Sequence, residues 1–431
     1  MSHGARLERT VGIGGYAFVA FNAVVGAGIF AMPGLVAGVL GPAAIIAYLV
    51  CMVLVGLVGL CFAEAGSRVP GTGGLYAYAA AAFGPVVGGV AGALLLFANT
   101  IASSAALARF FLDSLAVIWP AVEQPVFGIG LLSAFFAVLV MVNIAGTRDG
   151  ARLATVLSVV KLAPLVVLVI ASLFVLRPVN LEWQGIPPLA SIGEGSLLLV
   201  LAFIGIESAL NINGETRNPT RSIPRGIALA LAIVGVLYIS VQLSAQGVLG
   251  AALTSSKTPL ADTAGVVFGP WGARLLLIAS IVSVGGYFVS DLLASPRVAF
   301  ALAEAGQMPR WLAYVHPRHH TPAVAIIAYA VAVVALTATG SFRQLAVIGV
   351  SGTLLLYLIG CLGVLRMRAK GIAEAGPPFI APGGPVVPLA ASGIIVWLLS
   401  TLTWPELGGM LGFVVFFAII YAIREARRSR L

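Results

Sequence analysis

Long apolar runs, separated by short polar or glycine- and proline-rich segments, make up most of the chain. A run of roughly 20 residues is enough to cross the hydrocarbon core of a bilayer as a helix. The pattern predicts twelve helices, at about residues 11–40, 42–65, 78–112, 125–145, 152–176, 192–214, 223–249, 265–305, 321–339, 342–366, 385–402 and 406–424. We therefore expect an all-α polytopic membrane protein whose residues 1–431 form a single membrane domain.

The first apolar run contains a segment that weakens it as a helix. Asn22–Gly34 reads NAVVGAGIFAMPG, with Gly26 and Gly28 at its centre and Pro33-Gly34 shortly after. Glycine destabilises a helix and proline removes a backbone donor, so the helix is predicted to break near Gly26–Gly28. Unpaired backbone is tolerated in a membrane only where protein encloses it or a ligand meets it. A binding site and simple close packing of helices are both compatible with these glycines.

A second apolar run is interrupted at the matching position of the chain's second half, around Phe203–Glu207. Paired interrupted helices are typical of transporters built from an inverted repeat. We expect residues 11–176 to form the first repeat of five helices and residues 192–366 the second. An odd number of spans gives the two repeats opposite orientations, and the two helices of 385–424 are additional.

The basic residues indicate the orientation of the chain. Of its 24 Lys and Arg residues, 18 fall in the segments on the side of the N-terminus and 4 in those on the other side. This bias predicts a multi-pass protein of the cell (inner) membrane with both termini in the cytoplasm. It also argues against a nucleic-acid partner, because the net charge of +9 is spread over loops as a topology signal.

Composition narrows the class of function. The chain is 60% hydrophobic and 9% charged, which fits contact with the lipid bilayer over most of its surface. Cys51, Cys61 and Cys361 sit in apolar runs and predict neither disulfides nor a metal site. No histidine and no ligand-spaced cluster of acids lies in a predicted span, so we expect no enzyme, no metal and no cofactor. A channel or a sensor fits the two interruptions less well than a carrier does.

Four ordered motifs resemble those of the amino acid–polyamine–organocation (APC) permeases. They are GAGIF (Gly26–Phe30), RVPGTGGLYAY (Arg68–Tyr78) with AFGP (Ala82–Pro85), FIGIES (Phe203–Ser208) with ETRNPTRSIPRGI (Glu215–Ile227), and SPRVAFALAEAGQMP (Ser295–Pro309). The resemblance covers the first ten helices. It implies the fold of the sodium-coupled leucine transporter and a small amine-bearing substrate, usually an amino acid.

The physical chemistry of the broken helices agrees with a zwitterionic substrate. Exposed amides at Gly26–Gly28, at a half-helix N-terminus, would hold a carboxylate. Carbonyls freed near Ala23–Val24 and Phe203–Gly205 would accept hydrogen bonds from an ammonium. Some arginine-exchanging relatives have an aromatic gate at the position of Leu201, so its absence disfavours large cationic substrates. The candidate substrate-binding residues are Ala23, Val24, Gly26, Ala27, Gly28, Ile29, Asn99, Leu201, Phe203, Ile204 and Gly205.

Three charged residues inside predicted spans are candidates for coupling or gating: Lys161, Glu207 and Asp291. Lys161 follows Arg152 by nine residues, about 13 Å along a helix, which places it near mid-membrane. It is either a structural lysine or, as the resemblance implies, the residue that takes the place of a sodium ion. Glu207 follows the second break, where relatives also carry a glutamate. Asp291 could pair with Arg109 or Lys161, or could face the pocket and favour a polyamine.

Charged residues in the cytoplasmic segments predict a possible inner gate. Glu215, Arg217 and Arg221 fall on the same side as Arg68 and could form ion pairs with it, although a solvated loop explains them equally well. The sequence therefore predicts a sodium-independent amino acid transporter, working as an exchanger or with protons, for a small or aliphatic neutral substrate. A polyamine or other organic-cation permease is the alternative, and the oligomeric state stays open.

Overall fold

The computed structural model describes residues 12–26, 28–69, 74–145, 162–183, 185–206, 216–217, 219–374 and 377–428. Within these ranges the chain is helical, and no β-strand occurs among them. Seven of the described helices are long and apolar enough to cross a membrane, and several shorter apolar helices accompany them. The all-α polytopic fold class is confirmed.

The first predicted helix is interrupted, as the glycines indicate. Its parts are α1 (Ile13–Val24), the short 3-10 turn η1 (Gly28–Phe30) and α2 (Met32–Leu40). A further turn, η2 (Gly41–Ala44), leads into the long helix α3 (Ile45–Arg68). Pro33 falls in the first turn of α2, where its missing N–H would have no helical partner in any case.

The prediction of one helix over 78–112 was wrong at its start. Two helices occupy this region, α4 (Gly74–Phe83) and α5 (Pro85–Ala93), because Gly84 has a φ of 97° and Pro85 begins a new helix. The helix then continues for longer than predicted, through the π-helical η3 (Leu94–Ala102) and α6 (Ser103–Ile118). The turn η4 (Pro120–Glu123) connects it to α7 (Pro125–Ala145).

The middle of the chain contains the helix for which the second interruption is predicted. Of the predicted helix 152–176, the described part is α9 (Leu162–Ser172), followed by the turn η5 (Pro178–Leu181). The sixth helix consists of α10 (Leu189–Leu199) and the 3-10 turn η6 (Val200–Phe203), and its predicted second part lies outside the described residues. It is followed by α11 (Pro219–Leu249) and η8 (Gly250–Ser255).

The predicted helix 265–305 is two helices, α12 (Pro259–Phe268) and α13 (Pro270–Glu304). Gly269 separates them with a φ of 75°, and Pro270 starts the second. A short turn that was not predicted, η9 (Arg310–Ala313), follows. The remaining helices match their predicted runs within a few residues and are α14 (Ala323–Thr337), α15 (Phe342–Ala369), α16 (Val386–Leu399) and α17 (Trp404–Arg428).

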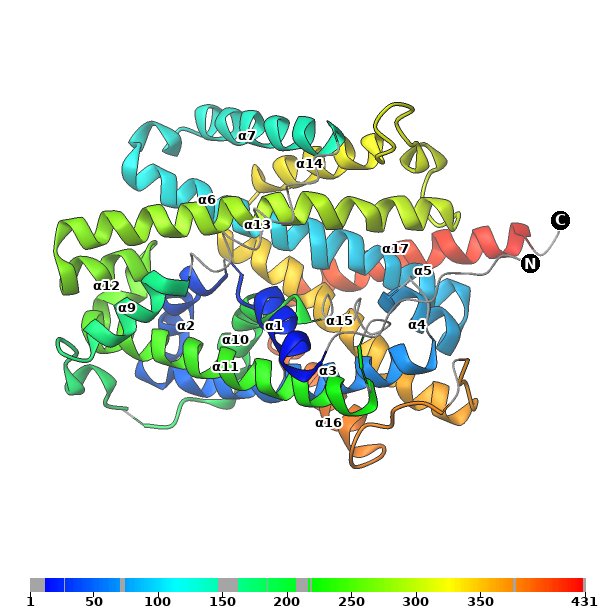
Figure 1. Ribbon diagram of the computed structural model, residues 1–431, viewed down its shortest axis with the longest axis horizontal. Coiled ribbons are helices and arrows are strands. Elements are labelled where there is room, and N and C mark those ends of the chain that lie inside the picture. The colour runs from blue at the N-terminus through cyan, green and yellow to red at the C-terminus, as the bar shows by residue number, and fades with distance from the viewer. Residues whose placement is uncertain are drawn as a thin grey trace.

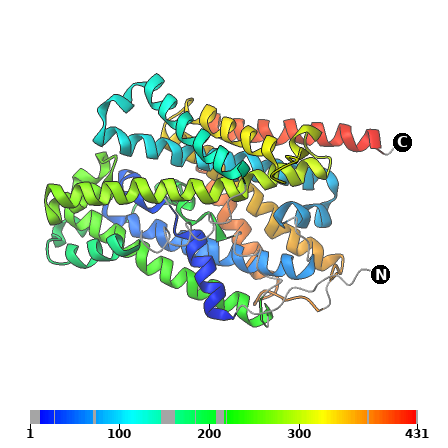
Figure 2. The ribbon, with the colours of Figure 1, turned by 45° about the horizontal axis from the view of Figure 1, so that its top comes forward.

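The interrupted segments lie in the middle of the bundle. In Figure 1 the long helices α11 and α13 run along the long axis, with α1, α2 and α10 in the central region near them. The helix α1 packs on α11, and α10 packs on α2 and α3. Figure 2 shows α17 along an outer edge, and its large apolar side chains, such as Phe416 and Ile419, point outward as expected for contact with lipid.

Candidate functional site

The first helix, α1, ends at Val24, and Val25 donates its last helical hydrogen bond. The Val25 N–H still donates to the Phe21 carbonyl at 2.8 Å, but the Gly26 N–H turns back to the Val24 carbonyl at 2.7 Å. Regular helix resumes in α2, after the turn that begins at Gly28. The break therefore falls where the sequence predicts it. Ala27, one of the predicted binding residues, lies outside the described residues.

The second break leaves the helix at Ile204. Its N–H still donates to the Val200 carbonyl at 3.1 Å, but its backbone is extended, with φ −61° and ψ 139°. Gly205 follows with a φ of 120°, a conformation that side chains with a Cβ rarely adopt. Phe203 and Leu201 are buried just before the break. The extended backbone of Ile204 and the positive φ of Gly205 thus end this helix, and no proline is involved.

The two breaks touch each other through their glycines. A Cβ on Gly28 would lie 3.0 Å from the Ala202 Cα, and a Cβ on Gly205 would collide with the Ala23 carbonyl oxygen. At Gly205 only glycine allows this approach, and at Gly28 a Cβ would require Ala202 to shift. The tertiary fold therefore brings the two segments, which are far apart in the sequence, into direct contact.

A side chain that the sequence analysis missed connects the two breaks. The hydroxyl of Tyr238, on α11, is 3.1 Å from the Val24 carbonyl oxygen and 3.1 Å from the Ala202 carbonyl oxygen. It has one hydrogen to share between these two acceptors. Its ring packs edge-on against Phe203, with centroids 5.3 Å apart, and the residue is fully buried. A tyrosine between the aliphatic residues Leu237 and Ile239 was the signal that could have found it.

The predicted side-chain lining is buried around this centre. Ile29 is fully buried in η1, and Leu201 is buried in η6. Asn99 lies in the π-helical η3, and its amide donates to the Thr353 hydroxyl on α15 at 3.4 Å. Because α15 also contacts η6, Asn99 and the second break lie against the same helix. Lys161 and Glu207 lie outside the described residues.

Asp291 is buried among hydroxyl groups. Its Oδ2 accepts hydrogen bonds from the Ser104 hydroxyl at 2.9 Å and the Tyr329 hydroxyl at 2.8 Å. Its Oδ1 accepts from Ser295 at 2.6 Å. The possible pairing with Arg109 is wrong, because the Arg109 guanidinium is bound to Asp113 one turn further along α6. Asp291 instead joins α6, α13 and α14.

A second charged cluster, which we call the Glu64 cluster, lies at the end of α3. The fully buried Glu64 carboxylate accepts from Arg68 at 2.8 Å and 3.0 Å and forms an ion pair with Arg368 of α15. The Ala381 N–H adds a hydrogen bond of 2.8 Å. Arg68, expected to meet the segment of Glu215, thus has Glu64 as its partner. Glu215 lies outside the described residues.

The sequence profile of the family described as Amino acid permease matches residues 14–424. The chain is 26% identical to the methylthioribose transporter of Bacillus subtilis, over 99% of this chain and 95% of the relative. It is 25% identical to the branched-chain amino acid permease of that organism, with the same coverage of both chains. It is 27% identical to the serine/threonine exchanger of Bacillus subtilis, over 98% of each chain.

Proposed function

Because the chain belongs to the amino acid permease family, and is therefore a multi-pass membrane transporter and not an enzyme, we propose that it carries a small or aliphatic neutral amino acid by alternating access. Residues 11–176 and 192–366 would be the inverted repeats, with 385–424 added to them. Both termini would face the cytoplasm of a cell whose inner membrane holds the protein, in agreement with the distribution of Lys and Arg.

The observation that carries this proposal is the meeting of two broken helices at a shared hydroxyl. The carbonyls of Val24 and Ala202 converge on one donor, the Tyr238 hydroxyl, at 3.1 Å each. An ammonium has three N–H donors and would satisfy the same carbonyls with stronger, charge-assisted bonds. The substrate ammonium would thus replace the tyrosine as their partner. Its carboxylate would lie at the amides of Gly26–Gly28, with the Gly26 N–H released from the Val24 carbonyl.

The buried surroundings support a neutral side chain on the substrate. Ile29, Leu201 and Phe203 offer apolar contact close to the breaks. The names of two relatives, a branched-chain amino acid permease and a serine/threonine exchanger, are consistent with such a substrate. A polyamine is less well supported, because the Asp291 carboxylate already accepts three hydroxyl hydrogen bonds.

We further propose that transport is independent of sodium. Lys161, the residue matched by the resemblance, would hold the place of the cation, and Glu207 would organise the segment after the second break. Coupling to protons or to exchange would then rest on these groups, with Asp291 as a third candidate. Uptake that requires sodium would contradict this part, as would full proton dependence of uptake in Lys161→Met.

Counterflow in proteoliposomes tests the proposed function. Vesicles loaded with unlabelled L-leucine or L-serine are expected to accumulate the labelled amino acid faster than empty vesicles. Gly205→Ala should abolish this uptake, because its Cβ would collide with the Ala23 carbonyl oxygen. The matched control is Gly393→Ala on α16, where an added Cβ meets nothing within 4 Å. Equal uptake by both variants would contradict a substrate site at the breaks.

A further inference from the structure

A cavity of about 290 Å³ lies beside the end of α6, and none of the predicted substrate-binding residues lines it. It is lined by α6, by η4 and by the segment before α12, which contributes Lys257. Its size is near the lower limit of ligand pockets, which suits a molecule of a few heavy atoms. Leu112 and Val122 contribute apolar walls, and Arg109, Asp113 and Glu123 contribute charges along with Lys257.

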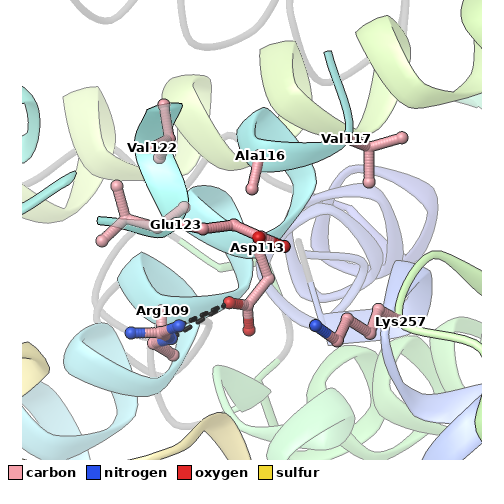
Figure 3. Close-up of a pocket in the computed structure, with 8 residues that line it drawn as sticks. Arg109, Asp113, Ala116, Val117, Val122, Glu123 and Lys257 are labelled. Atoms are coloured by element: carbon pink, nitrogen blue, oxygen red, sulfur yellow. Dashed lines mark hydrogen bonds and ion pairs between the residues drawn. The ribbon is translucent and has the colours of Figure 1, made fainter. Parts of the chain in front are cut away.

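The four charges around this cavity are not all paired with one another. Arg109 binds Asp113 through its Nη2, which is 2.9 Å from Oδ1, so these two charges cancel. Glu123 and Lys257, which are both exposed, form no ion pair or side-chain hydrogen bond with any residue that the structure describes. Figure 3 shows the charged ends of all four side chains gathered about the same space. The cavity therefore presents one unpaired carboxylate and one unpaired ammonium to a ligand.

This arrangement is complementary to an α-amino acid. Glu123 would receive the ligand's ammonium and Lys257 its carboxylate, while an aliphatic side chain would contact Leu112 and Val122. We propose that the cavity is a second binding site, at which a neutral zwitterionic amino acid binds before it reaches the broken helices. The identity of the ligand rests on the proposed function, whereas the charge pattern does not.

The position of the cavity supports a place on the substrate's route. Arg109 and Lys257 line it, and the next residue after each, Phe110 and Thr258, belongs to a closely packed region with no space for a water molecule. Phe30, which ends η1 directly after the first break, belongs to the same packed region. The buried rings of Phe30 and Phe110 therefore lie between the charged cavity and the break. The Lys and Arg bias places this end outside the cell, where a substrate would arrive.

Protection of an introduced cysteine tests occupancy directly. The three native cysteines are buried, so Ala116→Cys, at the wall of the cavity, would supply the reactive thiol. Purified protein in nanodiscs is treated with a cationic methanethiosulfonate in the presence of L-leucine or L-serine. At an amino acid concentration of about two to nine times the dissociation constant, we expect the reaction to slow by about threefold to tenfold, because only the empty site reacts. Isoamylamine, without a carboxylate, and 4-methylpentanoate, without an ammonium, should not protect.

A double variant tests whether protection depends on the Glu123 carboxylate and the Lys257 ammonium. Glu123→Gln with Lys257→Met should remove the protection of Ala116→Cys by the amino acid. The control pair, Glu182→Gln with Arg274→Met, makes the same charge changes at exposed sites outside the cavity and should retain it. If Ala116→Cys does not fold, Val117→Cys serves as the second reporter, because Val117 also lines the cavity.

Gly205→Ala separates this inference from the proposed function. Protection that persists when Gly205→Ala has abolished counterflow supports an independent site. Protection that disappears with Gly205→Ala overturns the inference, because it then reports a change relayed from the broken helices. Active counterflow without any protection also overturns it and leaves the proposed function standing. Absence of counterflow in the unaltered protein contradicts the proposed function, and protection by L-leucine would still support the second site.

Discussion

The broken helices and the Glu64 cluster both bury polar atoms inside an apolar bundle, but with different partners. At the breaks, two backbone carbonyls share the neutral Tyr238 hydroxyl. In the cluster, a fully buried carboxylate is matched by the guanidinium groups of Arg68 and Arg368. A neutral hydrogen bond contributes little net free energy and can be exchanged for another, whereas a buried charge without its partner is very costly.

This difference assigns different mechanical roles to the two regions. A carrier must release the contacts of its binding site in each cycle. The weak and interchangeable hydrogen bonds at the breaks would allow this at the proposed site. The Glu64 cluster joins α3 to α15 and also binds the Ala381 N–H. We therefore expect its ion pairs to remain intact throughout the transport cycle. Asp291 lies between these extremes, since it is a buried carboxylate whose partners are neutral hydroxyls.

The largest expected effect is that of Glu64→Ala. It leaves Arg68 and Arg368 buried or half-buried without their carboxylate, which should lower the free energy of unfolding by roughly 3–5 kcal/mol. Thermal unfolding of the purified protein measures the loss. Glu425→Ala, an exposed glutamate on α17, is the control and should change little. A loss below about 1 kcal/mol would mean that the cluster is no more rigid than the breaks.

Substitution of Asp291 tests the intermediate case. Asp291→Leu removes the acceptor of the Ser104, Ser295 and Tyr329 hydroxyls and should cost roughly 2–3 kcal/mol of stability. Asp291→Asn keeps one carbonyl acceptor and should cost about half as much. The measurement is again thermal unfolding. Equal losses in the two variants would show that packing, and not hydrogen bonding, accounts for the effect.

Tyr238→Phe should have a smaller effect on stability, about 1–2 kcal/mol, because one neutral hydroxyl is removed from two carbonyls. Its specific consequence is faster hydrogen–deuterium exchange in the peptide that contains Val25 and Gly26. Tyr48→Phe is the matched control, since it removes a buried hydroxyl that donates to Gln242, also on α11, at 3.0 Å. The same acceleration at the breaks in both variants would contradict a bridging role for Tyr238.

The smallest effect is expected for Arg343→Met. Its ion pair with Glu194 is largely exposed, and such pairs contribute about 0–1 kcal/mol. Thermal unfolding at low and high salt should show a slight loss that disappears as salt rises. A loss as large as that of Glu64→Ala would remove the distinction between exposed and buried charge on which the comparison of the two regions rests.

Some local errors of the sequence interpretation have a common cause. The helices predicted at 78–112 and 265–305 are each divided before a proline, at Gly84 and Gly269. Hydropathy continues across both divisions because lipid or protein still surrounds the chain there, so the apolar pattern does not register a turn. The Gly-Pro pairs were the better signal, since a positive φ at glycine ends one helix and proline favours the start of the next.

The sequence by itself determined the all-α membrane fold, the family motifs and the first interruption, because apolar length, glycine and proline act locally. It also identified Asp291 as a buried charge but left its partners open. Only the tertiary structure decided that Gly28 meets Ala202, that Tyr238 joins the two breaks, and that Arg368 reaches Glu64. These contacts connect residues that are far apart in the chain, and bundle geometry alone sets which side chains lie within hydrogen-bonding distance.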